Sequence, residues 1–186
     1  MDKEIIVIGD IEIGAGTITD DFISDKLFSE FIDELCAREH PVDLILNGDT
    51  FDFLKCPFFK KGKATYPRHI TLDISMQKLH SMYKAHPLFF SSLSKFVKNR
   101  INSIYFTYGN HDMDLEFTEV KKEIRQLLKS KKNVHFKMYY QKHKVYAEHG
   151  HEYDFLNKVK RSELFMTHGN KAILNFPWIT FGLMSN

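Results

Sequence analysis

The sequence has little cysteine, little net charge and no long apolar run. Its two cysteines, Cys36 and Cys56, are too few for a disulfide framework or a zinc knuckle. The 26 Lys and Arg residues against 24 Asp and Glu leave a formal net charge of +2, which argues against a strongly basic nucleic-acid coat protein and against an acidic disordered tail. No apolar run approaches the roughly 18 residues that span a bilayer, and no signal peptide precedes the first apolar segment. We therefore expect a cytoplasmic protein without a transmembrane segment.

Motifs for covalent catalysis and for phosphate cradling are also missing. The chain has no Gly-x-Ser-x-Gly elbow and no Gly-x-x-x-x-Gly-Lys loop. What it does have is 186 residues, 43% of them hydrophobic, which is enough for one domain with a substantial core. Ten histidines are left out of the charge sum and need an explanation.

Strand and helix patterns alternate along the chain. The strand patterns are short, rich in β-branched residues and closed by polar turns, and the helix patterns repeat apolar residues every three or four positions. Strands are predicted at 4–9, 42–46, 103–108, 134–137 and 144–148, and helices at 22–35 (with Thr19 or Asp20 as its cap), in two patterns split by Pro87, and at 118–131. This alternation predicts an α/β fold.

Polar clusters follow four of the predicted strands. They contain Asp, Glu, Asn and His, which are hard or borderline metal ligands, and each lies beside a glycine that allows a sharp turn. The clusters are Asp10-Ile11-Glu12, Asp49-Thr50-Phe51-Asp52, Asn110-His111-Asp112 and His149-Gly150-His151. Because ligands bind at the carboxyl edge of open α/β sheets, the four clusters together predict a metal site.

The same segments resemble the first four motifs of the calcineurin-like metallophosphoesterases. Order and strand context agree over roughly residues 4–157, and Gly109-Asn110-His111-Asp112 is the most specific of the four. Asp49-Thr50-Phe51-Asp52-Phe53 also resembles the bacterial branch that includes UDP-2,3-diacylglucosamine hydrolases. The resemblance implies a metallophosphoesterase-type β-sandwich flanked by helices, formed by residues 1–186 as a single domain.

The resemblance also implies a role for each motif residue. Asp10 would bind a first divalent metal ion, Asp49 would bridge two ions, and Asn110 and His149 would bind the second. His111 would stabilise or protonate the leaving group, and Asp112 would orient His111. Mn²⁺ is the ion we expect first, with Fe, Zn or Mg as alternatives.

Two departures from the family pattern bear on this prediction. Glu12 stands where the family usually has histidine, so it is either an oxygen ligand that favours harder ions or a bystander. The final Gly-His-x-His or Gly-His-x-Thr motif is missing, and His168 in Thr167-His168-Gly169-Asn170 is predicted as a helical surface residue rather than a substitute ligand. Together with an apolar ending over 172–184, this leads us to expect a domain that is incomplete at its C-terminus.

Residues of about 53–100 form a connection too long for a plain loop, so we expect a cap-like insertion there. Its basic residues, Lys55 among them, and its aromatic residues could hold an anionic substrate or stack on a base; the alternative is a solvated loop over an apolar patch. His151, next to the presumed ligand His149, is predicted to bind substrate, although it could instead cap the next helix.

Two functions are consistent with these patterns. The first is a metal-dependent phosphoesterase that hydrolyses a phosphomonoester, phosphodiester or pyrophosphate bond with water activated by two metal ions. Its substrate would be a small-molecule or lipid-like phosphate ester, since a near-neutral chain is poorly suited to nucleic acid. The alternative is a non-catalytic binding module of the same fold with a degenerate metal site. The sequence does not predict the oligomeric state.

Overall fold

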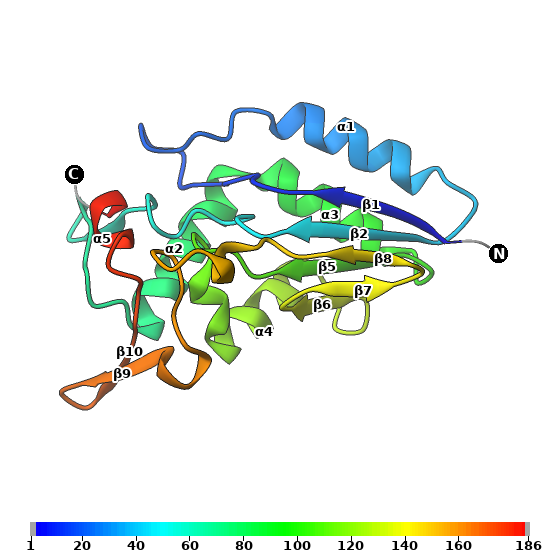
Figure 1. Cartoon of the computed structure of the whole chain (residues 1–186). Coiled ribbons are helices and arrows are strands. Elements are labelled where there is room, and N and C mark those ends of the chain that lie inside the picture. The colour runs from blue at the N-terminus through cyan, green and yellow to red at the C-terminus, as the bar shows by residue number, and fades with distance from the viewer. Residues whose placement is uncertain (1–2, 185–186) are drawn as a thin grey trace.

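The centre of the molecule is a parallel four-stranded sheet (Figure 1). The computed structural model describes residues 3–184. All three strand pairings in this sheet are parallel, in the order β1-β2-β5-β6. The strands are β1 (Glu4–Ile8), β2 (Val42–Asn47), β5 (Ser103–Thr107) and β6 (Val134–Lys137). The predicted α/β class is therefore confirmed.

Helices cover one face of the sheet. Strand β2 points Val42, Leu44 and Leu46 into the main core, because alternate side chains of a strand share a face. Apolar side chains of the helices, among them Ile32 and Phe96, fill the same core. The helices are α1 (Asp25–Cys36), α2 (Leu72–Ala85), α3 (Pro87–Lys98), α4 (Thr118–Leu127) and the short α5 (Thr180–Leu183).

A hairpin covers part of the other face. Strands β7 (Tyr140–Lys142) and β8 (Val145–Ala147) pair antiparallel, and Tyr140 packs with Ile45 and Tyr105 in a second, smaller core. In Figure 1 the hairpin lies in front of the sheet, with α3 behind it. The strand predicted at 144–148 thus belongs to this hairpin and not to the parallel sheet. A full β-sandwich and an incomplete C-terminus stay predictions.

The long connection after β2 contributes to the main core. Leu79 and Met82 of α2 and Phe89 and Phe90 of α3 are almost fully buried there. A small hairpin, β3 (Phe58–Lys60) with β4 (Lys63–Thr65), precedes α2. The segment predicted as a cap-like insertion thus supplies two helices to the body of the domain.

The final segment adds one more hairpin, β9 (Phe165–His168) with β10 (Lys171–Leu174). Leu174 donates a backbone hydrogen bond to Ile70, 3.0 Å, and its side chain is buried in the main core. His168 is exposed on β9, a strand and not the helix expected from the sequence. Within residues 3–184, no helix combines the length and the apolar character that crossing a bilayer would need.

Helix α1 begins later than the sequence suggested, because Asp20 has another role. Its carboxylate accepts hydrogen bonds from the backbone of Gly14 (3.0 Å) and Gly16 (2.6 Å), and from His86 Nε2 at 2.8 Å. The other ring nitrogen of His86 lies 2.7 Å from Asp25 Oδ2. Both nitrogens face carboxylates, so the imidazole is held in its doubly protonated form. Burial opposes that charge, but the two carboxylates raise the pKa of His86 above its ordinary value.

We expect His86→Gln to destabilise the protein by about 1–3 kcal/mol at pH 6, because charge-assisted hydrogen bonds to a nearly buried pair are lost. A raised pKa in the folded state gives stability that is full below the unfolded value of about 6.5 and is lost as pH rises through the folded value. The difference in unfolding free energy between wild type and variant, measured with urea, should therefore shrink toward pH 9. A difference that grows with pH would contradict the assignment.

Candidate metal centre

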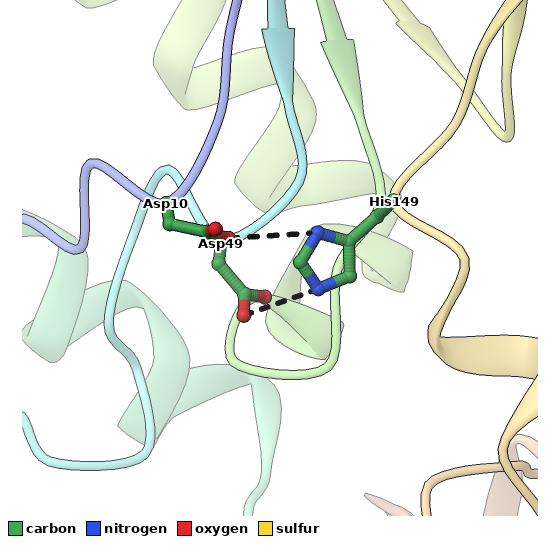
Figure 2. Close-up of side chains that lie close together, drawn as sticks. All are labelled: Asp10, Asp49 and His149. Atoms are coloured by element: carbon green, nitrogen blue, oxygen red, sulfur yellow. Dashed lines mark ion pairs between the residues drawn. The ribbon is translucent and has the colours of Figure 1, made fainter.

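The predicted ligand residues meet at the carboxyl edge of the sheet. The loops after β1 and β2 run side by side, joined by a hydrogen bond from Glu12 N to Asp49 O, 2.8 Å, and by a parallel bridge between Ile13 and Phe51. The loop after β5 and the segment after β8 complete the ring. Figure 2 shows Asp10, Asp49 and His149, which come from three of these segments and face one another.

One group of ligands surrounds His149. Its Nε2 lies 3.1 Å from Asn110 Oδ1 and 3.3 Å from Asp49 Oδ2, and its Nδ1 lies 3.7 Å from Asp10 Oδ1. Asp10, Asp49 and His149 offer ligand atoms that all lie within 4.8 Å of one another. The donors are two carboxylates and an imidazole, with the amide oxygen of Asn110 adjacent.

A second group shares Asp49. Ligand atoms of Glu12, Asp49 and His111 also lie within 4.8 Å of one another. Glu12 Oε1 is 3.7 Å from His111 Nδ1. The backbone N–H of His111 donates to Asp49 Oδ1 at 2.9 Å. Asp49 is thus the residue that the two groups share, with Oδ2 near His149 and Oδ1 held by the backbone N–H of His111.

The backbone around Asp49 is built for this position. Asp49 is 4% exposed and has a left-handed φ of 45°, as do Asp10 and Glu12 at 53° and 52°. Non-glycine residues with such angles are uncommon and cluster at functional sites. Gly109 has no side chain because a Cβ there would overlap both the carboxylate and the backbone nitrogen of Asp49.

Gly109→Ala should therefore displace Asp49 and weaken Mn²⁺ binding at least tenfold, with a loss of about 1–3 kcal/mol of stability from overpacking. Isothermal titration with Mn²⁺ measures the first effect and thermal unfolding the second. The matched control is Gly62→Ala, whose methyl group meets nothing within 4 Å and costs only about 1 kcal/mol for its left-handed φ of 78°. Equal Mn²⁺ affinity in the two variants would argue against the close approach.

The family resemblance implied that Asp112 orients His111, but in the structure a different aspartate, Asp52, lies beside the His111 ring. Asp112 is fully buried and accepts backbone hydrogen bonds from Gly109 (2.6 Å) and Thr50 (3.1 Å). The carboxylate beside the imidazole of His111 belongs to Asp52, with Oδ1 3.2 Å from Nδ1. Asp112 therefore clamps the loops after β2 and β5 together, and Asp52 orients the His111 ring. Asp52 was part of the motif, but nothing in the sequence separated its role from that of Asp112.

The electrostatics follow from this crowding of carboxylates. Burial opposes ionisation of Asp49, yet the hydrogen bond from His149 and the charge of His111 hold its pKa below the usual value. Burial also opposes the charge on His149, but Asp49 raises the pKa of His149 to about 9. A proton therefore occupies the imidazole near neutral pH, and a metal ion binding there must displace it.

His151 differs from its neighbour. Burial and the charge of His149, whose ring centroid is 5.4 Å away, lower the pKa of His151 to about 4. Its Nδ1 is buried and has no hydrogen-bond partner among the described residues. The ring lines a small cavity together with Tyr108 and Asn157. His151 is thus a neutral imidazole with an unused polar atom beside the metal ligands.

Lys55 is a member of the site that the sequence did not single out. Its ammonium lies 2.9 Å from Glu12 Oε2, 2.5 Å from Asp21 Oδ2 and 3.0 Å from Asp52 Oδ2. The sequence placed it among the basic residues of the insertion. Its spacing of three residues from Asp52 was the only signal that it turns back toward the site.

Carboxylate, amide and imidazole donors converging from four loops fit a divalent metal ion of hard or borderline character. An α/β fold with such donors at the carboxyl edge of its sheet is typical of metal-dependent hydrolases. Comparison with known families agrees: the family model for calcineurin-like phosphoesterases matches residues 3–181. The chain belongs to this family. Neither the curated proteins nor the solved structures contain a match to it.

Proposed function

We propose that the protein hydrolyses a phosphate ester or pyrophosphate bond at this centre, using two divalent metal ions, with Mn²⁺ preferred over Fe, Zn or Mg. The observation that carries the proposal is the position of Asp49, which belongs to both groups of candidate ligands. Bound ions would supply charge neutralisation of the phosphoryl group and activation of water.

The residues of the chain have distinct roles in this proposal. Asp49 would serve both ions, Asp10, Asn110 and His149 would hold the ion on one side, and Glu12 would lie on the other. Asp10, which the family resemblance assigned to the ion opposite His149, lies instead beside that imidazole. A carboxylate is needed at position 49 because it offers one charged oxygen to each side. The neutral amide of Asn110 adds a ligand without adding charge.

His111 is proposed as the group that acts on the leaving oxygen. Burial disfavours its charge, but the hydrogen bond to Asp52 and the charge of Asp49 raise its pKa above the ordinary value. The raised pKa favours the protonated ring, and Asp52 fixes its Nδ1 side. A proton held this way can be given to a leaving alkoxide or phosphate.

We further propose a substrate class for this reaction. The resemblance to the UDP-2,3-diacylglucosamine hydrolase branch favours a small-molecule or lipid-like phosphate ester, and the net charge of +2 favours it over nucleic acid. The neutral ring of His151, beside His149, is suited to donate a hydrogen bond to a phosphate oxygen.

Metal removal tests the proposal. Dialysis against a chelator should abolish hydrolysis of generic phosphomonoester and phosphodiester substrates, and added Mn²⁺ should restore it, because a site rich in carboxylates needs the ions to offset the charge of the phosphoryl group. Ca²⁺, which prefers more oxygen ligands, should restore less. Turnover that persists in metal-free protein would refute the mechanism.

The second candidate function is a non-catalytic binding module, and the contact between Lys55 and Glu12 favours it. A lysine that neutralises one of the expected ligands is a feature of a site that no longer holds two ions. This reading predicts at most one bound metal ion and no turnover on any of the generic substrates after Mn²⁺ loading. Metal stoichiometry and turnover on the same sample separate the two functions.

A further inference from the structure

The ammonium of Lys55 lies among carboxylates at the edge of the candidate metal centre. Its three carboxylate partners, Glu12, Asp21 and Asp52, come from three positions in the loops after β1 and β2. The side chain is only 24% exposed. An ion pair with several partners in a partly buried position is far stronger than a single surface pair.

The backbone fixes the lysine at this place. Lys55 N donates to Asp52 Oδ1 at 3.0 Å, so the residue sits on a tight turn directly after the third carboxylate. Its carbonyl accepts a hydrogen bond from Thr19 Oγ1 at 2.9 Å. These two hydrogen bonds fix the backbone of Lys55, from which its ammonium reaches Glu12.

Glu12 is the candidate metal ligand that the ammonium of Lys55 contacts. Its Oε2 contacts Lys55, while its Oε1 faces His111. A divalent ion approaching the same carboxylate would meet the positive charge of the ammonium at close range. Coulomb repulsion between like charges a few ångström apart is large at the intermediate dielectric of a half-buried site.

The opposite half of the centre carries no such charge. Throughout residues 3–184, neither Asp10 nor Asp49 forms an ion pair with lysine or arginine; their charged partner is His149. The two halves of the centre therefore differ, because an ion that enters on the Glu12 side would have to displace the ammonium of Lys55.

We propose that Lys55 is an internal cation that competes with one of the two metal ions for Glu12. The ion held by Asp10, Asp49, Asn110 and His149 then binds first, and the ion on the Glu12 side binds only when the ammonium moves away. Lys55 thus sets how many ions the protein holds at a given metal concentration. This inference rests on the proposed function, since it concerns the occupancy of the same centre.

Titration of metal-free protein with Mn²⁺ tests the inference. In wild type we expect one tight equivalent and a second at least about tenfold weaker, since a unit charge close to the ion opposes it. Lys55→Met should strengthen the second equivalent at least about tenfold. At two equivalents, electron paramagnetic resonance should show a spin-coupled Mn²⁺ pair in the variant and mostly isolated Mn²⁺ in wild type.

Three further variants make the result specific. Lys55→Arg keeps the charge and should titrate like wild type. Lys95→Met removes a lysine that pairs with Asp33 on the helical face, 2.8 Å, and should also titrate like wild type. Lys55→Gln removes the charge with a polar side chain and replaces Lys55→Met if thermal unfolding shows that the methionine variant does not fold.

The failures of the two proposals are distinguishable. Equal second-site affinity in wild type and in the neutral Lys55 variants would overturn the competition while leaving a working dinuclear centre. Absence of even the first equivalent, in wild type as in Asp49→Asn, would instead overturn the proposed function and with it the inference.

Discussion

Asp49→Asn is expected to lower Mn²⁺-dependent phosphoester hydrolysis by about a thousandfold or more. The carboxylate belongs to both groups of candidate ligands, with Oδ2 3.3 Å from His149 Nε2 and Oδ1 2.9 Å from the backbone nitrogen of His111. Asparagine offers one neutral oxygen in place of two that share a negative charge, so one half of the centre loses its ligand. Several kcal/mol of transition-state stabilisation depend on the ions in such centres.

The measurement is kcat/KM on a generic phosphodiester together with the Mn²⁺ content of the purified protein. Asp33→Asn is the matched control, because Asp33 is half exposed on α1 and pairs only with Lys95. The control should keep wild-type activity and metal content. An Asp49→Asn protein that hydrolyses and binds Mn²⁺ as well as this control would show that the chemistry takes place elsewhere.

Asp112→Ala is expected to destabilise the metal-free protein by about 2–5 kcal/mol. The variant leaves the buried N–H groups of Gly109 and Thr50 without their acceptor, and each unsatisfied donor costs about 1–3 kcal/mol. Burial and the charge of Asp49 act in the opposite direction, since they raise the pKa of Asp112 to about 7. When Asp112 is protonated, the repulsion from Asp49 is absent and the hydrogen bonds from Gly109 and Thr50 remain.

The raised pKa of Asp112 also predicts how the loss of stability in the variant changes with pH. A carboxyl whose pKa is raised in the folded state contributes stability below its unfolded value of about 4 and loses it as pH rises through about 7. The loss caused by Asp112→Ala should therefore be larger at pH 5.5 than at pH 8, measured by urea unfolding. Asp73→Ala, at an exposed carboxylate on α2, should cost little at either pH. A loss that is absent at pH 5.5 would contradict the clamp.

Local patterns in the sequence were sufficient for much of the fold. The β-branched segments at 42–46 and 103–108 are strands β2 and β5, because short apolar runs closed by glycine have few other stable conformations. Parallel strands then bring their carboxyl ends to one edge, so Asp10, Asp49 and Asn110 could be placed together from the sequence alone. The family resemblance implied that Asp49 bridges two ions, and this role stays a prediction; the structure places Asp49 in both groups of candidate ligands.

Other features depend on contacts between distant segments. The strand before His149 was expected from the sequence, but its place in the β7–β8 hairpin was not, because apolar alternation does not say which layer a strand joins. Asp20 was expected to cap α1 but hydrogen-bonds His86, 66 residues away. No local pattern encodes a partner at such a separation.

The sequence by itself determined the parallel α/β framework and the chemical identity of the ligands, because both follow from the residue types in and directly after each strand. Only the tertiary structure decided that Asp52 orients His111, that Asp112 clamps two loops, and that Lys55 neutralises Glu12. These are contacts that charged side chains make with side chains or backbone of the loops around them. Their geometry depends on how the loops pack, which the spacing of residues along the chain does not fix.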